Sequence, residues 1–192
     1  MRLWTIQPPE VLEIINETGR FICDKSKTMY SEYDQIQRAY KWLIDKMTDP
    51  YNIDKPEGVE LPIWAWHTWN WKHKKPDFRM SGLGVRGTKY VCIELEIPDN
   101  EVLLSDFDAW HCVLNDHYYN PARTEKSWDR MEKIFDSYRP ELQEVIKIES
   151  WNCIFNIKPF KNEFCSIGQY IQATFWEIRK EDIISVKEFI AR

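Results

Sequence analysis

Tryptophan constrains this chain more than any other residue type, because 10 of its 192 residues are tryptophan. A tryptophan side chain is costly to leave in water, and its indole N–H needs a hydrogen-bond partner when it is buried. The fold must therefore provide a large aromatic core, a stacking surface, or both. Six tryptophans occur one per predicted element, as expected of core anchors: Trp4, Trp42, Trp110, Trp128, Trp151 and Trp176. The other four lie close together in the chain: Trp64, Trp66, Trp69 and Trp71.

Length and charge indicate a globular protein with one domain, residues 1–192. The 26 basic and 31 acidic residues give a net charge of −5. No apolar run approaches the roughly 20 residues of a membrane helix, and the N-terminus does not resemble a signal peptide. The five cysteines form no Cys-x-x-Cys pair, so we expect reduced thiols in the cytoplasm. The four histidines lack the spacing of zinc ligands, and we expect no bound metal.

The hydrophobic periodicity predicts an α+β fold rather than alternating βαβ units. Strands are predicted over five ranges: 2–7, 61–66, 90–97, 102–104 and 167–178. Helices are predicted to begin near Pro8, Ser31, Ser105 or Asp106, Thr124 and Pro140. Residues 67–89 read as a long loop, and residues 183–190 fit either a helix or an edge strand. The arrangement expected is a mixed, split β-sheet with flanking helices.

The apolar residues of the helix that follows Thr124 are expected to face the core. They are Trp128, Met131, Ile134, Phe135 and Tyr138. Gly19 is expected to end the first helix, because glycine adopts the left-handed conformation of a helix C-terminus at little cost.

The strongest local signal is a basic stretch directly after the clustered tryptophans. Six Lys or Arg residues and one acid lie between Lys72 and Lys89, a local charge of +5 in a chain whose net charge is negative. Basic residues interleaved with aromatic ones suit phosphates and stacked bases, of a nucleic acid or of a nucleotide cofactor. The alternative is that the tryptophans pack in the core and the lysines belong to a solvated loop.

Two further polar groups attract attention. Asp106 and Asp108 near a helix start form either a catalytic pair or, more commonly, a helix cap. Gln172 lies in an aromatic strand, either at a cleft or at a solvated edge. The motifs of phosphate-loop NTPases, Rossmann dehydrogenases and Gly-x-Ser-x-Gly hydrolases are absent, which removes these classes.

Five segments resemble a bacterial family catalogued as domain of unknown function 3841, over almost the whole chain. They are Leu3-Trp4-Thr5-Ile6-Gln7, Pro62-Ile63-Trp64-Ala65-Trp66, Lys75-Pro76-Asp77-Phe78-Arg79, Asp106-Phe107-Asp108-Ala109-Trp110 and Gln172-Ala173-Thr174-Phe175-Trp176. The layout is also similar to the ADP-ribosyltransferase fold, through a first strand, a helix ending in Gly19, and a strand at residues 91–97 followed by Pro98-Asp99 and residues 102–104.

The second resemblance implies an NAD-binding cleft between two sheets. Such enzymes commonly use a His or Arg on the first strand and a Glu on a late strand, whereas this first strand has no His. The residues expected to bind NAD are Arg2, Thr5, Gln7, Trp64, Trp66 and Arg79, with Arg79 on phosphate. Gln172 or Glu177 is expected to stabilise the charge on the ribose during catalysis.

The activity implied is transfer of ADP-ribose from NAD to RNA or DNA, the glycosyltransferase class of reaction. A toxin of a toxin–antitoxin or phage-defence system is the expected setting, with an antitoxin protein as a partner. Nucleic acid is expected to contact the tryptophan and lysine cluster: Trp69, Trp71, Lys72, Lys74 and Lys75. The alternatives are a non-catalytic nucleic-acid-binding module and a protein-interaction module that uses exposed tryptophans as anchors.

Overall fold

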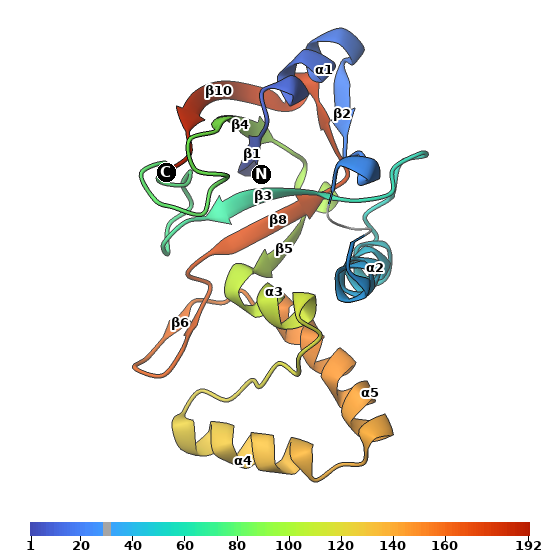
Figure 1. Cartoon of the computed structure of the whole chain (residues 1–192), viewed down its shortest axis with the longest axis vertical. Helices are drawn as coiled ribbons and strands as arrows, with labels where there is room; N and C mark the ends of the chain where they lie inside the picture. The colour runs from blue at the N-terminus through green and yellow to red at the C-terminus, as the bar shows by residue number, and fades with distance from the viewer. Residues whose placement is uncertain (29–31) are drawn as a thin grey trace.

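A computed structural model describes residues 1–28 and 32–192 of the chain. Six strands form the main sheet (Figure 1): β1 (Arg2–Gln7), β3 (Ile63–Thr68), β4 (Lys89–Glu96), β5 (Leu103–Asp106), β8 (Ile171–Phe175) and β10 (Ile183–Ile190). Their order is β10-β4-β1-β3-β8-β5, so the first and last strands of the chain share one sheet. All pairings between these strands are antiparallel.

The sheet is split in its middle. All six residues of β1 pair with β4, whereas β1 pairs with β3 at one position, Trp4 opposite Trp66. The sheet therefore consists of two three-stranded halves, β10-β4-β1 and β3-β8-β5, joined at Trp4 in the middle of β1. The α+β class and the split sheet are confirmed. The expected mixed sheet is wrong, because the strands described here pair only in the antiparallel sense.

Different helices cover the two faces of the sheet. Helix α1 (Glu10–Thr18) packs Val11 and Ile15 onto one face, in a core that includes Leu3 and Ile93. Gly19 ends α1 with φ 84° in the left-handed region, as predicted. On the other face, α2 (Asp34–Thr48) and α3 (Phe107–Leu114) form a second core. The predicted helix start near Ser31 lies outside the described residues.

Four of the six tryptophans predicted as core anchors are buried: Trp4, Trp110, Trp151 and Trp176. Trp42 is half-buried. The fully buried Trp151 belongs to one of four short 3₁₀ helices of the described chain. These are η1 (Lys25–Lys27), η3 (Asp99–Glu101), η4 (Trp151–Phe155) and η5 (Lys180–Asp182).

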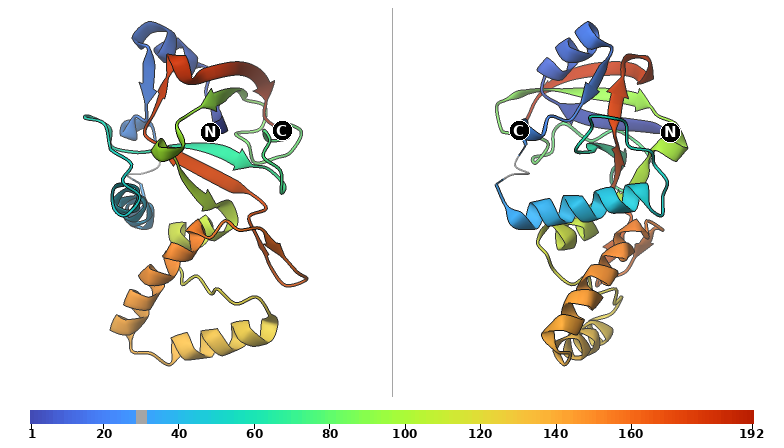
Figure 2. Two further views of the ribbon diagram at one scale, coloured as in Figure 1. Left: turned by 180° about the vertical axis from the view of Figure 1, so that it is seen from behind. Right: turned by 90° about the vertical axis from the view of Figure 1, so that its right-hand side faces the viewer.

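Two helices extend away from the sheet as an arm, α4 (Glu125–Asp136) and α5 (Pro140–Ser150), as both views in Figure 2 show. Thr124 caps α4 as predicted, accepting a hydrogen bond from the Ser127 backbone N–H. The prediction that the apolar face of α4 points into the core is wrong. Trp128 is 39% exposed and Ile134 is 41% exposed, because α4 lies at the far end of the arm.

The strand predicted over residues 167–178 is in fact divided. Residues 166–167 form β7, which pairs with β6 (Phe160–Lys161), and β8 begins at Ile171. After β8, β9 (Glu177–Arg179) leaves the main sheet and pairs with the short β2 (Arg20–Ile22), which the sequence did not predict. The change of sheet occurs at Trp176, whose indole N–H donates to the Ile53 carbonyl in the core. Residues 183–190 form an edge strand.

Candidate functional site

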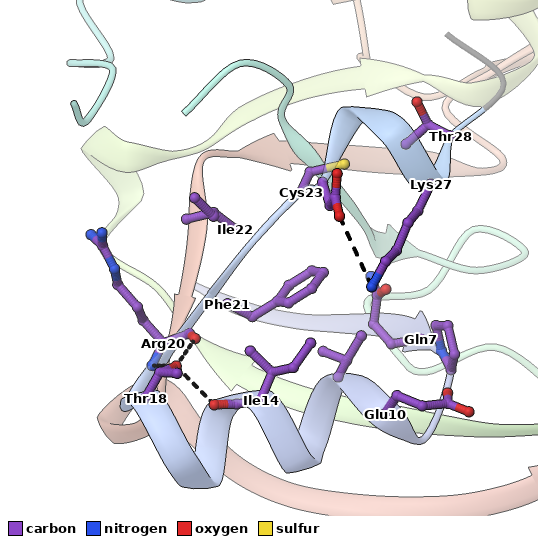
Figure 3. A pocket seen from close by; sticks show the side chains of 13 residues that line it. Gln7, Glu10, Ile14, Thr18, Arg20, Phe21, Ile22, Cys23, Lys27 and Thr28 are labelled. Carbon is purple, nitrogen blue, oxygen red and sulfur yellow. Dashed lines mark hydrogen bonds and ion pairs between the residues drawn. The ribbon is translucent and has the colours of Figure 1, made fainter. Parts of the chain in front are cut away.

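One hollow of the molecule lies where β1 ends. Figure 3 shows a hollow of about 730 Å³ between α1 and the β2–η1 segment. A second hollow of about 400 Å³ opens between the end of β1, the start of β3 and α2. The two adjoin, because both are lined by Gln7, Phe21, Cys23 and Thr28. We call their union the β1 cleft. It lies at the end of β1 away from the Trp4–Trp66 contact, where the two half-sheets are no longer paired.

A chain of hydrogen bonds fixes the polar side of the β1 cleft. Gln7 Nε2 donates to Thr5 Oγ1 at 2.8 Å, and Thr5 Oγ1 donates to the Trp64 carbonyl at 2.7 Å. Thr5 is fully buried, so it acts as a link between β1 and β3 rather than as a ligand group. No described residue hydrogen-bonds to Gln7 Oε1, which leaves an acceptor at the cleft.

Trp64 forms an aromatic wall of the β1 cleft. Its indole N–H donates to the Tyr40 hydroxyl at 3.0 Å, and its ring lies 5.1 Å from that of Trp110. Burial raises the pKa of the Tyr40 phenol and of the Cys23 thiol. Both groups are therefore neutral near pH 7, and the cleft presents rings and uncharged polar atoms at this end.

Charged groups of both signs also line the β1 cleft: Glu10, Arg20, Asp24 and Lys27. Arg20 and Lys27 line it, and in Figure 3 Lys27 extends from η1 toward the side that Gln7 occupies. Lys27 is 3.9 Å from Asp24. Arg20 lies 3.3 Å from Glu177, whose side chain is only 17% exposed. Glu177 is thus linked to the cleft through Arg20.

Gln172 lies on β8, outside the lining of the β1 cleft. It is opposite Trp66 of β3 on one side and opposite Ser105 of β5 on the other. Trp66 belongs to an aromatic cluster with Trp69, Phe107 and Tyr170, at ring distances of 4.8 to 6.5 Å. The structure therefore does not bring Gln172 and Trp66 to the lining of the β1 cleft with Gln7.

The two arginines expected at NAD also lie away from the β1 cleft. Arg2 is at the opposite end of β1 from Gln7, roughly 17 Å along the strand, and pairs with Glu94 at 3.5 Å. Arg79 is held by Asp77, with Nη2 2.6 Å from its Oδ2. This pair lowers the pKa of the Asp77 carboxyl through hydrogen bonds from Arg79. Of the expected NAD ligands, only Gln7 and Trp64 line the cleft together.

The residues expected to bind nucleic acid also do not form one site. Trp69 is buried and half-buried Trp71 sits in a tight turn with φ 67°, a strained value for a bulky residue. The exposed Lys74 and Lys75 instead line a separate hollow of about 860 Å³ together with Arg79. We call this hollow the basic groove. Its lining residues are Lys74, Lys75, Pro76, Asp77, Phe78, Arg79, Lys187, Phe189, Ile190 and Arg192. Lys72 is exposed and is not part of that lining.

The acid pair near α3 has a structural role. Asp106 is buried, and its carboxylate accepts hydrogen bonds from the Ala109 and Gly168 backbone N–H groups at 3.0 and 2.6 Å. Burial raises the pKa of Asp108, and the neighbouring Asp106 adds to this effect. Helix capping, the more common of the two alternatives, is therefore what the structure shows for Asp106.

Sequence reasoning missed several lining residues of both hollows. Arg20, Phe21 and Lys27 lie on a three-residue strand and a 3₁₀ turn, which are too short to show a period. Lys187 and Phe189 lie on β10, about a hundred residues from the basic loop, and no local pattern connects them. The one sequence signal available for Lys187 and Phe189 was the alternation of polar and apolar residues in β10.

The chain thus adopts an α+β fold with a split antiparallel sheet, and the β1 cleft opens where the two half-sheets separate. Residues 2–184 match the model of the family described as Domain of unknown function (DUF3841), and the chain belongs to that family. No curated protein and no solved structure matches the chain. In the described part of the chain, no helix has the length and apolar character of a membrane span, and no cluster of three or more His, Cys, Asp or Glu side chains could hold a metal ion.

Proposed function

We propose that this chain is an ADP-ribosyltransferase-like enzyme that transfers ADP-ribose from NAD to RNA or DNA. A cytoplasmic toxin–antitoxin or phage-defence system, with an antitoxin protein as partner, belongs to the same proposal. The observation that carries it is the β1 cleft, which opens where β1 and β3 separate and whose two parts are both lined by Gln7. Ligand clefts commonly have about 300–1,000 Å³, and both parts of the β1 cleft fall in this range.

The lining of the β1 cleft suits a dinucleotide. Phe21 and Trp64 offer apolar ring surface for a base or a nicotinamide ring. Arg20 and Lys27 offer positive charge for a pyrophosphate, which arginine can bind in a bidentate manner. Gln7 Oε1 is available to accept from a carboxamide or a ribose hydroxyl. These roles replace those of Arg2, Trp66 and Arg79, which lie away from the cleft.

Glu177 is the carboxylate that we assign to the reaction, because it contacts Arg20 of the cleft lining. In the proposed step the bond between ribose C1′ and the nicotinamide nitrogen breaks, and nicotinamide leaves with the bonding electrons. An oxygen or nitrogen of the nucleic acid then bonds to C1′ and gives up its proton. A carboxylate stabilises the positive charge that develops on the ribose and can accept that proton. Arg20 orients Glu177 through their 3.3 Å contact.

The test is nicotinamide release by the purified chain, with NAD and either single-stranded RNA or single-stranded DNA as acceptor. Glu177→Gln keeps the size of the side chain and is expected to lower the rate about 100-fold or more. Glu181→Gln, on the exposed η5 turn, is the matched control and should retain the rate. No nicotinamide release with any acceptor, or equal rates for the two variants, would overturn the proposal.

A second candidate, the non-catalytic nucleic-acid-binding module, is favoured by the lysines of the basic groove. It requires nucleic acid to bind without NAD, and it requires the Glu177→Gln variant to behave as the unmodified chain in every assay. The same nicotinamide measurement therefore separates the two candidates.

A further inference from the structure

The basic groove is formed by two distant parts of the chain. One wall is the loop segment 74–79 that follows β3, and the other is the end of β10 with Arg192. Its volume is about 860 Å³, and none of the residues that line the β1 cleft belongs to its lining. The groove therefore represents a second place where a ligand can bind.

The two walls of the groove are held together by specific contacts. At the far end of the loop, outside the groove lining, the Gly87 N–H donates to the Ala191 carbonyl at 2.9 Å, and the Ala191 N–H donates to the Thr88 carbonyl at 3.0 Å. The rings of Phe78 and Phe189 stack at 4.4 Å with an interplanar angle of 13°. The loop is thus fixed beside β10 by backbone and ring contacts, and the groove exists before any ligand arrives.

The groove also gathers cations that have no counter-ion. Lys74, Lys75 and Lys187 form no ion pair with any residue among 1–28 and 32–192. The one acidic side chain in the lining, Asp77, is already held by Arg79. Elsewhere on the molecule cations such as Arg38, Lys147 and Arg179 are paired. Placing like charges together is unfavourable, and an anionic ligand would relieve this.

Two of these lysines affect the pKa of the same thiol, that of Cys92. Burial raises the pKa of the Cys92 thiol to about 12, and Lys75 and Lys187 both oppose this rise. Lys75 comes from the loop and Lys187 from β10, so cations from both walls line the same groove.

Aromatic rings accompany the cations. Phe78 and Phe189 are half-buried, and the Lys187 ammonium lies 5.6 Å from the centre of the Phe78 ring. Proteins that bind single strands combine a basic groove with aromatic rings, because each unpaired base can stack while the backbone follows the charges. A duplex keeps its bases stacked inside, and a flat anionic membrane surface does not enter a concave groove.

We infer that the basic groove binds single-stranded nucleic acid, through Lys74, Lys75 and Lys187 on phosphates and the Phe78–Phe189 pair on a base. This inference deepens the proposed function, on which it rests for the role of that strand as the acceptor of ADP-ribose. The strand would approach the enzyme on a surface separate from the β1 cleft.

The inference is tested by fluorescence anisotropy of the full chain with a labelled single-stranded oligonucleotide of roughly 16 nucleotides, without NAD. The variant carries Lys75→Ala and Lys187→Ala, and the charge-matched control carries Lys126→Ala and Lys133→Ala on α4. The groove variant should bind about tenfold more weakly, whereas the control should not change. The slope of log affinity against log salt should fall by about 0.7 for each groove lysine removed.

A second variant separates ring stacking from charge. Phe78→Leu keeps apolar packing against Phe189 but removes a ring, so we expect weaker binding of the oligonucleotide with an unaltered salt slope. The same sequence as a duplex, and vesicles containing phosphatidylserine, serve as competitor ligands. Both should bind more weakly than the single strand.

Equal affinity of the groove variant and the α4 control would overturn the inference, as would tighter binding of the duplex or of the vesicles. This outcome is distinct from failure of the proposed function, because the binding assay contains no NAD. A chain that binds the strand through the groove but releases no nicotinamide would refute only the enzymatic proposal. A chain that releases nicotinamide but whose groove variant binds normally would refute only the groove.

Discussion

The β1 cleft and the basic groove are built in different ways. The cleft is lined by side chains that also belong to the packing of the molecule: Trp64 packs against Trp110, and Thr5 links β1 to β3 beneath Gln7. The groove is lined by exposed lysines on a loop and an edge strand, together with a half-buried ring pair.

The two hollows should therefore respond differently to substitution. Replacing a side chain of the cleft wall should lower stability, because its contacts continue into the core. Replacing a groove lysine should change stability little, since it forms no ion pair with a described residue. The following variants test this contrast.

Trp64→Ala should have the largest effect on stability. It removes the ring contact with Trp110 and the hydrogen bond to Tyr40, and should lower the free energy of unfolding by about 3 kcal/mol. Urea denaturation followed by circular dichroism measures this. Trp128→Ala on the exposed arm is the control and should change stability much less. A small effect of Trp64→Ala would show that the cleft wall is independent of the core.

Tyr40→Phe should have a smaller effect. The variant removes the hydroxyl that accepts from the Trp64 indole N–H, leaving that donor without this partner. The expected cost is about 1–2 kcal/mol in the free energy of unfolding, from the same urea measurement. Tyr138→Phe, on the exposed arm, is the matched control. Equal stability of the two variants would mean that water replaces the Tyr40 hydroxyl, and that the wall is more open than its ring contacts indicate.

The pH dependence of stability should reveal His67, on the strand that begins at the cleft and leads to the groove loop. Burial lowers the pKa of His67 from 6.5 to about 4, and the stacked His73 adds to this. Above about pH 6.5 the group is neutral in both folded and unfolded chains. As the pH falls toward 4, the unfolded chain binds a proton that the folded chain does not, so stability should fall.

His67→Gln removes this contribution and should make the pH dependence of unfolding shallower between about pH 6.5 and 4. Urea denaturation across that interval measures it, with His117→Gln as a comparison. Parallel curves for His67→Gln and the unmodified chain would show that His67 is protonated in the folded state.

Lys187→Ala should have the smallest effect on stability. Its side chain is exposed and unpaired with described residues, so the free energy of unfolding should change by less than about 0.5 kcal/mol. Thermal or urea unfolding of the isolated chain is the measurement. A clear gain in stability would show that repulsion among the groove cations is substantial, and a clear loss would show that Lys187 has a packing role over Phe78.

Much of the fold could be predicted from the sequence. The alternation in residues 90–97 predicts β4, where Val91, Ile93 and Leu95 are fully buried on one face. Thr124 and Gly19 predict the start of α4 and the end of α1 through local backbone chemistry. These features involve neighbours along the chain, which is why a pattern can reveal them.

The site could be predicted only in part. Gln7 and Trp64 do line the β1 cleft, but Arg79 is held by Asp77 in the basic groove. Trp69, expected at a binding surface, is buried, whereas Trp128, expected in the core, is 39% exposed. A tryptophan in a sequence shows the need for contacts but does not show whether neighbouring elements will provide them.

Most helices and strands of this protein, its α+β class and its local excess of positive charge can be predicted from residue type and short-range spacing alone. The separation of β1 and β3 beyond Trp4 and Trp66, and the position of Lys187 beside the loop lysines, are visible only in the folded structure. Such features arise from packing between segments far apart in the chain, and whether a cation keeps its counter-ion depends on that packing.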